Sequence, residues 1–376
     1  MTTPARLVPL TFGPGPGEVL WSSPGQCWTK PPPALLLDLS DGALPIPDLG
    51  LGPRRSQPRR LERFQNAHLT WTNFVIQDGH CTPIYDGDPR GLVESLLDWP
   101  GMGDVAGLVS KPSGLAACGD RLDTATRLPG PTLLGSAHEL ANWGMWLTYT
   151  LPAVQHFIEN RGAYRRLLVT AGHPNMVAML HLMGLTPADY TLHDATRTYW
   201  CEELHMLRQA RPEYAIPAAL RTLCAGLRAR VGGAAPAARR IYAGRRRRTA
   251  EGAYRPLLDE DALAAALAAL GCTEADPEYL TPEEQIATFA GSDAIVALGG
   301  AGLFNAMFAR PGTRVVTIES TPHFLPAHTD LLASCALPYG IVIGQIDRTD
   351  PTIWNKRWTL RVPEAAAAVA EYLLHP

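Results

Sequence analysis

The sequence lacks an excess of charge of either sign, and it lacks any long apolar run. Lysine and arginine number 33 against 36 aspartate and glutamate residues, which gives a formal net charge of −3. A chain that neutralises many nucleic-acid phosphates is strongly basic, so we expect no nucleic-acid partner. No run reaches the roughly 18 consecutive apolar residues of a membrane span. We therefore expect no transmembrane segment, while peripheral membrane contact stays open.

Paired cysteines and metal-binding motifs are also missing. The seven cysteines are scattered without a Cys-x-x-Cys pair, and an odd number does not describe a disulfide framework. No His-x-x-x-His ligand set and no G-x-S-x-G elbow occurs, so metallohydrolase and serine hydrolase functions have no support and no metal is expected. The first 20 residues are broken by proline and glycine before an apolar stretch forms, unlike a secretory signal. Together these absences predict a cytoplasmic protein.

The length and composition that are present predict a folded protein of about two domains. The chain has 376 residues, of which 46% are hydrophobic and 18% charged. Small residues and a proline interrupt any core-facing pattern at residues 231–236, where we place a boundary. The predicted division has a first domain over 1–232, with a loop- and β-rich part over 1–130 and a second part over 131–232, and a second domain over 233–361. A helix over 362–376 could pack back on the first domain.

The first 130 residues hold much of the glycine and proline and predict loops with short strands. Residues 69–76 are β-prone, and Gln77-Asp78-Gly79 after them is a turn signal between two strands. The charged stretch Pro53–Arg60 contains two prolines, and we expect it to be an exposed loop. This part of the chain carries no motif of its own.

Further along, apolar runs alternate with helical patterns. Leu167–Thr170 reads as a buried strand and Met176–Met183 as a helix closed by Gly184. The second half continues with helix, strand, helix and strand, at 259–270, 294–298, 303–310 and 313–318. Another helix begins at Thr281, with Glu284 at capping-box spacing. This alternation predicts an α/β fold with parallel strands in a doubly wound sheet.

A glycine turn follows the strand at 294–298. Gly299, Gly300, Ala301 and Gly302 would let an anion approach backbone N–H groups at the start of a helix, although glycines also simply permit a tight turn. As a dinucleotide fingerprint the turn fails, because Asn305 stands where a third glycine or alanine is wanted. A dinucleotide-dependent oxidoreductase is therefore only a distant alternative.

Basic residues precede the glycine turn in the sequence. Arg245 directly follows a short apolar strand and Arg255 leads into a helix, and arginine suits bidentate pairing with phosphate oxygens. The neighbouring Arg246, Arg247 and Arg248 are more typical of a solvated loop. If the two halves of this domain meet, Arg245, Arg255 and the glycine turn would converge on one diphosphate.

The order of these features resembles glycosyltransferase family 61, whose bacterial members make capsular and surface polysaccharides. The resemblance rests on an Ile-Tyr strand ending in Arg245, then Arg255, then Leu280-Thr281-x-x-Glu284-Gln285, then Gly300-Ala301-Gly302-Leu303-x-Asn305 and Pro311-Gly312 leading to Glu319. Upstream, Asn142-Trp143-Gly144 with Trp146-Leu147 is similar to the family's first motif, although spacing alone is typical of a core helix. The similarity covers roughly residues 65–320.

This resemblance implies a GT-B-like fold, with two Rossmann-like domains facing a cleft. The first domain, Rossmann-like over 131–232, would lie on the acceptor side, and the second, over 233–361, would bind the nucleotide-sugar. It implies an inverting, metal-independent transfer of a sugar, without a cofactor, from a nucleotide-sugar to a glycan or lipid-linked acceptor in surface polysaccharide biosynthesis. The implied donor-binding residues are Arg245, Arg255, Gln285, Gly299, Gly300, Ala301, Gly302, Asn305 and Glu319.

The sequence also departs from the family pattern at positions that exchange protons. Gly299 stands where the family has His, and Met145 and Tyr149 replace the His and the acid of the first motif. His138, Glu139 and His173 remain as candidates for the general base. The departures keep open a second hypothesis, a degenerate relative that binds nucleotide or glycan without transferring a sugar.

Overall fold

The structure is a computed structural model that describes residues 6–12, 17–42, 44–56, 58–71, 74–84, 108–111, 114–137, 139–209, 214–232, 240–247, 255–351 and 356–374. The chain divides into two compact units. The first joins Met1–Gly25 to Gln57–Pro212, and the second joins Gln26–Ser56 to Glu213–Pro376. Both units combine helices with sheets, so the predicted α/β class is confirmed. The predicted domain boundaries differ from this division in assigning residues 26–56 and 213–232 to the first domain.

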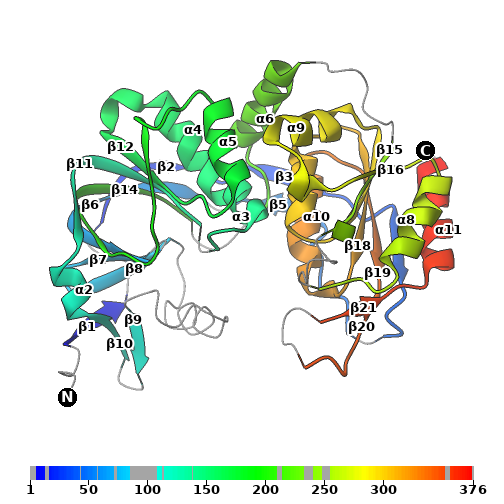
Figure 1. Ribbon diagram of the computed structural model, residues 1–376, viewed down its shortest axis with the longest axis horizontal. Helices are drawn as coiled ribbons and strands as arrows, with labels where there is room; N and C mark the ends of the chain where they lie inside the picture. The colour runs from blue at the N-terminus through cyan, green and yellow to red at the C-terminus, as the bar shows by residue number, and fades with distance from the viewer. Residues whose placement is uncertain are drawn as a thin grey trace. The chain divides into compact units, whose positions relative to one another are not determined.

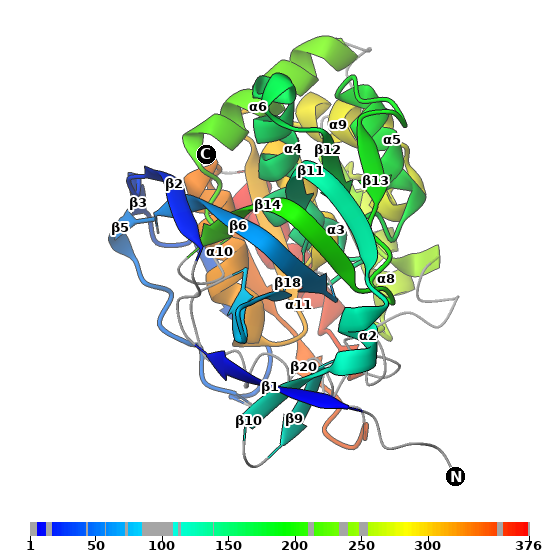
Figure 2. The same ribbon diagram turned by 90° about the vertical axis from the view of Figure 1, so that its left-hand side faces the viewer.

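The first unit is built on a large mixed sheet. In the part of the chain that the structure describes, its strands run in the order β13-β12-β11-β14-β6-β7-β8-β1-β10-β9, with β2 paired to β6. Figure 2 shows β11, β14 and β6 side by side. The strands are β1 (Leu7–Phe12), β2 (Glu18–Ser23), β6 (Arg59–Thr70), β7 (Phe74–Gln77), β8 (His80–Pro83), β9 (Leu108–Lys111), β10 (Gly114–Cys118), β11 (Thr126–Gly135), β12 (Arg166–Val169), β13 (Tyr190–Leu192) and β14 (Tyr199–Gln209).

Parallel strands with connecting helices form one end of this sheet. β11, β12 and β13 pair in parallel, and α4 (Leu151–Glu159) contacts β11. Leu167, Leu168 and Val169 are fully buried, as expected of an apolar run covered on both faces. α5 (Pro174–Leu182) follows, and Gly184 takes the left-handed conformation after it, with a φ of 84°. The strand and helix predicted here are confirmed.

The prediction of a loop over Pro53–Arg60 is wrong. β5 (Gly52–Arg55) pairs antiparallel with β3 (Cys27–Lys30), and β6 already begins at Arg59. The short β5 tolerates Pro53 because it pairs on one side only, so a missing N–H costs it no ladder bond on the open side. The hairpin predicted nearby is confirmed, since β7 and β8 are joined through Asp78 and Gly79, both with positive φ.

The second unit is built on a fully parallel sheet. Its strands run in the order β16-β15-β17-β18-β19-β4, and every adjacent pair is parallel. Helices α8 and α11 cover one face while α9 and α10 cover the other, which makes the sheet doubly wound as predicted (Figure 1). The elements are β4 (Leu35–Asp38), α6 (Ala218–Val231), β15 (Arg240–Ala243), α8 (Glu260–Ala269), β16 (Thr273–Ala275), α9 (Pro282–Gly291), β17 (Ala294–Leu298), β18 (Arg314–Glu319), α10 (Leu325–Ser334), β19 (Tyr339–Ile343) and α11 (Val362–Leu374).

The direction in which the chain adds strands to the sheet changes at β15, although all the strands stay parallel. The chain passes from β15 outward to β16 and then returns across β15 to β17, from where it continues outward to β18 and β19. In open parallel sheets, such a reversal leaves a crevice between the carboxyl ends of the two strands that flank it, and ligands bind there. Here those strands are β15 and β17. The residues that follow them, Gly244–Arg245 and Gly299–Gly300, therefore lie at the expected ligand-binding edge.

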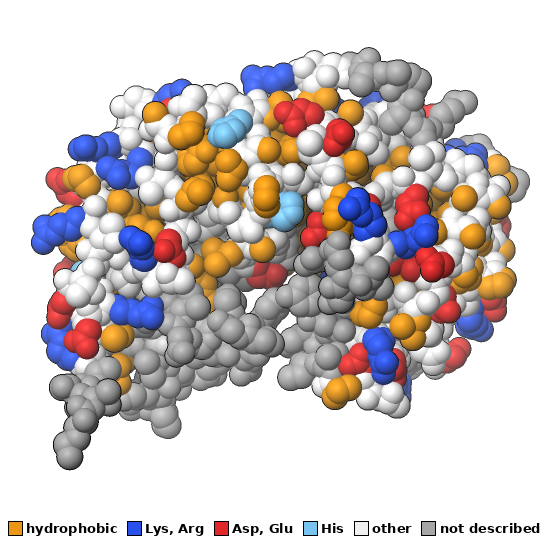
Figure 3. All heavy atoms as spheres, in the orientation of Figure 1, with side chains coloured by type: hydrophobic (Ala, Val, Ile, Leu, Met, Phe, Trp, Pro, Cys, Tyr) orange, Lys and Arg blue, Asp and Glu red, His pale blue; other side chains and the backbone are white. Residues whose placement is uncertain are grey.

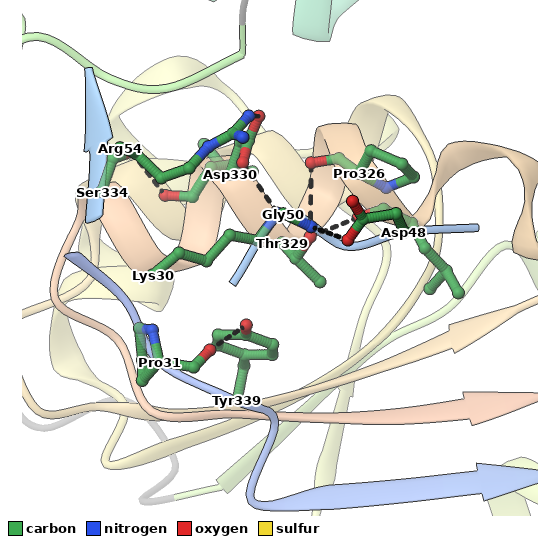
Figure 4. Close-up of polar contacts among 12 residues, drawn as sticks. Lys30, Pro31, Asp48, Gly50, Arg54, Pro326, Thr329, Asp330, Ser334 and Tyr339 are labelled. Carbon is green, nitrogen blue, oxygen red and sulfur yellow. Dashed lines mark hydrogen bonds and ion pairs between the residues drawn. The ribbon is translucent and has the colours of Figure 1, made fainter. Parts of the chain in front are cut away.

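Residues 26–56 add the sixth strand, β4, and are anchored on α10. The Lys30 ammonium lies 2.7 Å from Oδ1 of Asp330, and the Lys30 side chain is completely buried. Arg54 reaches the other oxygen of Asp330 at 3.9 Å, and the Tyr339 hydroxyl donates to the carbonyl of Pro31 at 2.6 Å (Figure 4). Burial lowers the pKa of Lys30, and Asp330 opposes that shift. A buried ion pair therefore joins segments 300 residues apart in sequence.

The C-terminal helix packs within the second unit. Ala365, Val369 and Leu373 recur every fourth residue and are buried in the same apolar cluster as Leu263 and Leu267 of α8. α11 also contacts β4. These contacts are all with the second unit. From the sequence, packing of this helix onto the first domain was also considered.

Candidate functional site

The side chain of Arg245 links the ends of β15 and β17. Its backbone N–H donates to Oε1 of Glu260 at 2.5 Å, and its Nη2 donates to the carbonyl of Gly299 at 2.6 Å. Oε1 of Glu260 also accepts the Tyr242 hydroxyl at 3.2 Å. Burial lowers the pKa of the Arg245 guanidinium, while the carboxylates of Glu319 and Glu260 oppose the shift. Arg245 is thus a partly buried cation held on the glycine turn.

The glycine turn has no room for side chains at its first two positions. A Cβ on Gly299 would lie 1.9 Å from Oε2 of Glu319, and a Cβ on Gly300 would lie 1.8 Å from Nη2 of Arg245. Gly300 also has a φ of 142°, a conformation that side chains disfavour. The glycines are therefore required by close approach of charged groups to the backbone.

Arg255 approaches the same turn from a strained loop position. Its φ is 52°, in the left-handed region, and its carbonyl accepts the indole N–H of Trp358 at 2.8 Å. The guanidinium carbon lies 4.8 Å from the ring centroid of Phe324, and Nη2 would be 3.3 Å from a Cβ on Gly300. Such strain in a non-glycine residue persists only where the surroundings hold it, and it is concentrated at functional sites. The structure thus brings Arg245 and Arg255 together at Gly300, as the sequence predicted.

Glu319 ends β18 beneath the turn, with a relative exposure of 1%. Its Oε1 accepts the Thr317 hydroxyl and lies 2.6 Å from Nδ1 of His328. Burial alone would raise the pKa of Glu319, but His328, Thr317 and Arg255 outweigh burial and lower it. The carboxylate is therefore ionised and directed inward, rather than offered on the surface.

The remaining predicted donor residues lie in η4 (Ala301–Phe308) or on α9, which contacts it. Ala301 and Gly302 open η4, a 3-10 helix where a helix was predicted from Leu303 to Arg310. Asn305 is fully buried and donates to the carbonyl of Gly302 at 3.2 Å. Gln285, on α9, donates to the carbonyl of Leu280 at 3.0 Å. The Asn305 bond fixes the backbone at the start of η4, whereas the Gln285 bond holds the residue that precedes the cap of its own helix.

The neighbouring arginines have surface partners. Arg246 pairs with Asp261 at 2.8 Å and with Glu274 at 2.7 Å, and the Arg247 guanidinium lies 3.6 Å from the ring centroid of Tyr279. In Figure 3, acidic and basic side chains also lie beside one another elsewhere on the surface that the view displays. The prediction of a solvated segment therefore holds for Arg246 and Arg247. Arg248 lies outside the described residues.

Two further residues near this edge were not predicted from the sequence. Burial raises the pKa of Asp276, which follows β16, to about 6, and its Oδ2 is buried without a hydrogen-bond partner among the described residues. His328 was missed because it lies on α10, nine residues after Glu319, and nothing in its local pattern marks it. Asp276 had a usable signal, its place after a strand, but β16 has only three residues and was not recognised.

The candidate bases of the first unit lie in two adjoining loops. Glu139, after β11, accepts from Nδ2 of Asn142 at 2.7 Å. His173, after β12, caps α5 by accepting the N–H of Asn175 at Nδ1, 3.2 Å away. The N–H of Gly172 donates to the carbonyl of Leu140 at 3.2 Å, so the two loops are in contact. His138 lies outside the described residues.

The first motif forms a buried helical segment. Asn142 caps α3 (Trp143–Met145), and a π-helical turn, η1 (Trp146–Thr150), continues into α4. Met145 and Tyr149 are 9% and 5% exposed. The indole N–H of Trp146 donates to the carbonyl of Thr170 at 2.9 Å, which ties the segment to the end of β12. The motif is therefore buried and helical, as expected of a core helix.

Within the described ranges, no group of three or more His, Cys, Asp or Glu side chains is arranged to hold a metal ion. Likewise, no helix in that part of the chain is long and apolar enough to cross a membrane. The expectation of metal-independent chemistry stays a prediction.

Residues 142–316 match the model of a protein family described as Glycosyltransferase 61. The matched stretch begins at the cap of the first motif, contains Arg245, Arg255 and the glycine turn, and ends within β18. The comparison with curated proteins finds no match.

Proposed function

Residues 142–316 belong to glycosyltransferase family 61, and from this premise we propose that the protein transfers a sugar from a nucleotide-sugar to a glycan or lipid-linked acceptor. The proposed reaction is inverting and independent of metal, and it serves surface polysaccharide biosynthesis in the cytoplasm, with peripheral membrane contact open. The proposed architecture is GT-B-like, with two Rossmann-like units facing a cleft and the donor held by the second unit.

The observation that carries this proposal is the convergence of Arg245, Arg255 and Gly300 at the carboxyl ends of β15 and β17. Guanidinium groups pair with phosphate oxygens in bidentate geometry. Glycines allow phosphate to approach backbone N–H groups at the start of η4. The order of strand addition changes direction between β15 and β17, and open parallel sheets bind ligands at the carboxyl ends of the strands that flank such a change.

The chemistry follows from these charges. An acceptor hydroxyl loses its proton to a general base and attacks the anomeric carbon, while the bond to the nucleoside diphosphate breaks. Arg245, Arg255 and the turn would stabilise the negative charge that develops on the leaving diphosphate, in place of a metal ion. Glu139 and His173 are the candidates for the base among the described residues. Their adjoining loops follow the carboxyl ends of the parallel strands β11 and β12.

A second candidate function is a relative that binds nucleotide or glycan without catalysis. It is favoured by the burial of Met145 and Tyr149, which stand at the positions of the family's proton-exchanging residues, and by the absence of a side chain at Gly299. The two candidates share the donor site and differ only in turnover.

Thermal unfolding with UDP, GDP, CMP, dTDP and NAD tests the proposal. A ligand that binds only the folded state stabilises it by about 2.7 kcal/mol at roughly 100 times its dissociation constant. We expect a shift with one nucleoside phosphate and none with NAD; a shift with NAD alone would instead favour an oxidoreductase. Detection of a transferred sugar in the presence of EDTA then separates the enzyme from the binding-only relative.

A further inference from the structure

His328 is a buried histidine directed at the donor side of the second unit. It lies on α10 with a relative exposure of 3%, and Nδ1 is 2.6 Å from Oε1 of Glu319. Its ring contacts Phe304 edge-to-face at a centroid distance of 5.9 Å and stacks with Phe324 at 6.2 Å. The aromatic rings fix the orientation of the imidazole, so its hydrogen bond to the carboxylate is directed. His328 lies beyond the residues matched by the family model.

The carboxylate that His328 holds is poorly placed for a phosphate-binding turn. Oε2 of Glu319 lies where a side chain of Gly299 would begin, so a negative charge lies directly behind the turn. Among the carboxylates near Arg245, Glu319 raises the pKa of the guanidinium most. The positive charge of Arg255 in turn lowers the pKa of Glu319. Glu319 and a bound diphosphate would therefore compete for the same two guanidinium groups.

We propose that His328 is a positioning residue of the donor site, which holds the carboxylate of Glu319 against α10 so that Arg245 and Arg255 can engage the diphosphate of a nucleotide-sugar. This inference rests on the proposed function. His328 acts through Glu319 and does not itself touch the ligand.

The physical reason lies in the competition between the two anions. A carboxylate oxygen that accepts from both Thr317 and His328 has less capacity left for guanidinium donors. Without the imidazole donor, the buried carboxylate must satisfy its charge elsewhere, and the nearest cations are those of the donor site. Loss of His328 should therefore weaken diphosphate binding through Glu319, so removal of the Glu319 charge should reverse the loss.

Titration calorimetry with UDP and GDP, and with uridine and guanosine as diphosphate-free probes, tests this coupling. We expect His328→Leu to weaken diphosphate binding about tenfold, in line with loss of a hydrogen bond to a charged group. His328→Asn keeps an N–H donor and should bind as the wild type does. The double variant H328L/E319Q should recover most of the affinity, a result that a purely structural role for His328 would not produce. Nucleoside affinity should not change.

His323→Leu is the matched control, because His323 also contacts the ring of Phe324, at 4.9 Å, but its side chain is exposed whereas that of His328 is buried. Unchanged affinity in H328L, or no recovery in H328L/E319Q, overturns the inference while leaving the donor site in place. If H328L does not fold, weakened binding by a folded H328N overturns it as well. Failure of the wild type to bind either diphosphate removes the proposed donor site, and this inference with it.

Discussion

At the scale of single residues, the proposed donor site is a set of charges that compensate one another around Gly299 and Gly300. Arg245 donates to the carbonyl of Gly299, Glu319 lies behind the same residue, and Arg255 faces Gly300. The sequence predicted Arg245 and Arg255 because each stands beside a recognisable element. It could not predict His328, since its partner Glu319 comes from another element and only the fold brings them together.

Asp276 gives a prediction at this scale. Burial raises its pKa from 3.8 to about 6, so the folded state binds the proton more tightly than the unfolded state does. The stabilisation by the bound proton is present at low pH and is lost as the pH rises through about 6. Asp276→Asn should therefore raise the melting temperature at about pH 7.5 and change it little at about pH 4.5.

Asp261→Asn is a suitable control for this experiment, because the Asp261 side chain is 89% exposed. A lower melting temperature of D276N at the higher pH would contradict the account, since it would mean that the ionised carboxylate makes a stabilising contact.

At the scale of elements, local signals predicted the second unit well. The capping box of Thr281 and Glu284 starts α9 as predicted, and β17 has the predicted bounds. Segment 26–56 was not predicted, because the pairing of β4 with β19 joins residues some 300 positions apart, and no local pattern encodes such a contact. The same reason explains the missed β5, whose partner β3 decides its conformation.

The anchor of segment 26–56 leads to an asymmetric prediction. Asp330→Asn leaves the Lys30 ammonium buried without its counter-charge and should cost about 3 kcal/mol of unfolding free energy. Lys30→Met should cost less, because Asp330 keeps Arg54 at 3.9 Å and its side chain is 15% exposed. Urea denaturation of the two variants gives the comparison. A larger loss in K30M than in D330N would show that the lysine stem, rather than the charge, holds the segment.

At the scale of the whole molecule, each unit has its own candidate residues for the proposed function. The second unit has a fully parallel sheet in which the order of strand addition changes direction between β15 and β17. Arg245 and Arg255 lie at the carboxyl ends of these two strands. The first unit brings the loops of Glu139 and His173 together at the ends of β11 and β12. Composition and motif order predicted the α/β class and the meeting of Arg245 and Arg255 at the glycine turn, whereas the residues of the first unit offered several candidate bases and no single choice.

The most direct test of the donor site compares Arg245→Ala with Arg246→Ala in titration calorimetry with the nucleoside phosphate that binds the wild type. The two arginines are adjacent, yet only Arg245 bonds the glycine turn, while Arg246 pairs with Asp261 and Glu274 on the surface. The account predicts that R245A loses detectable binding with its folded structure retained, and that R246A binds as the wild type does. Equal affinity in R245A and the wild type would contradict it.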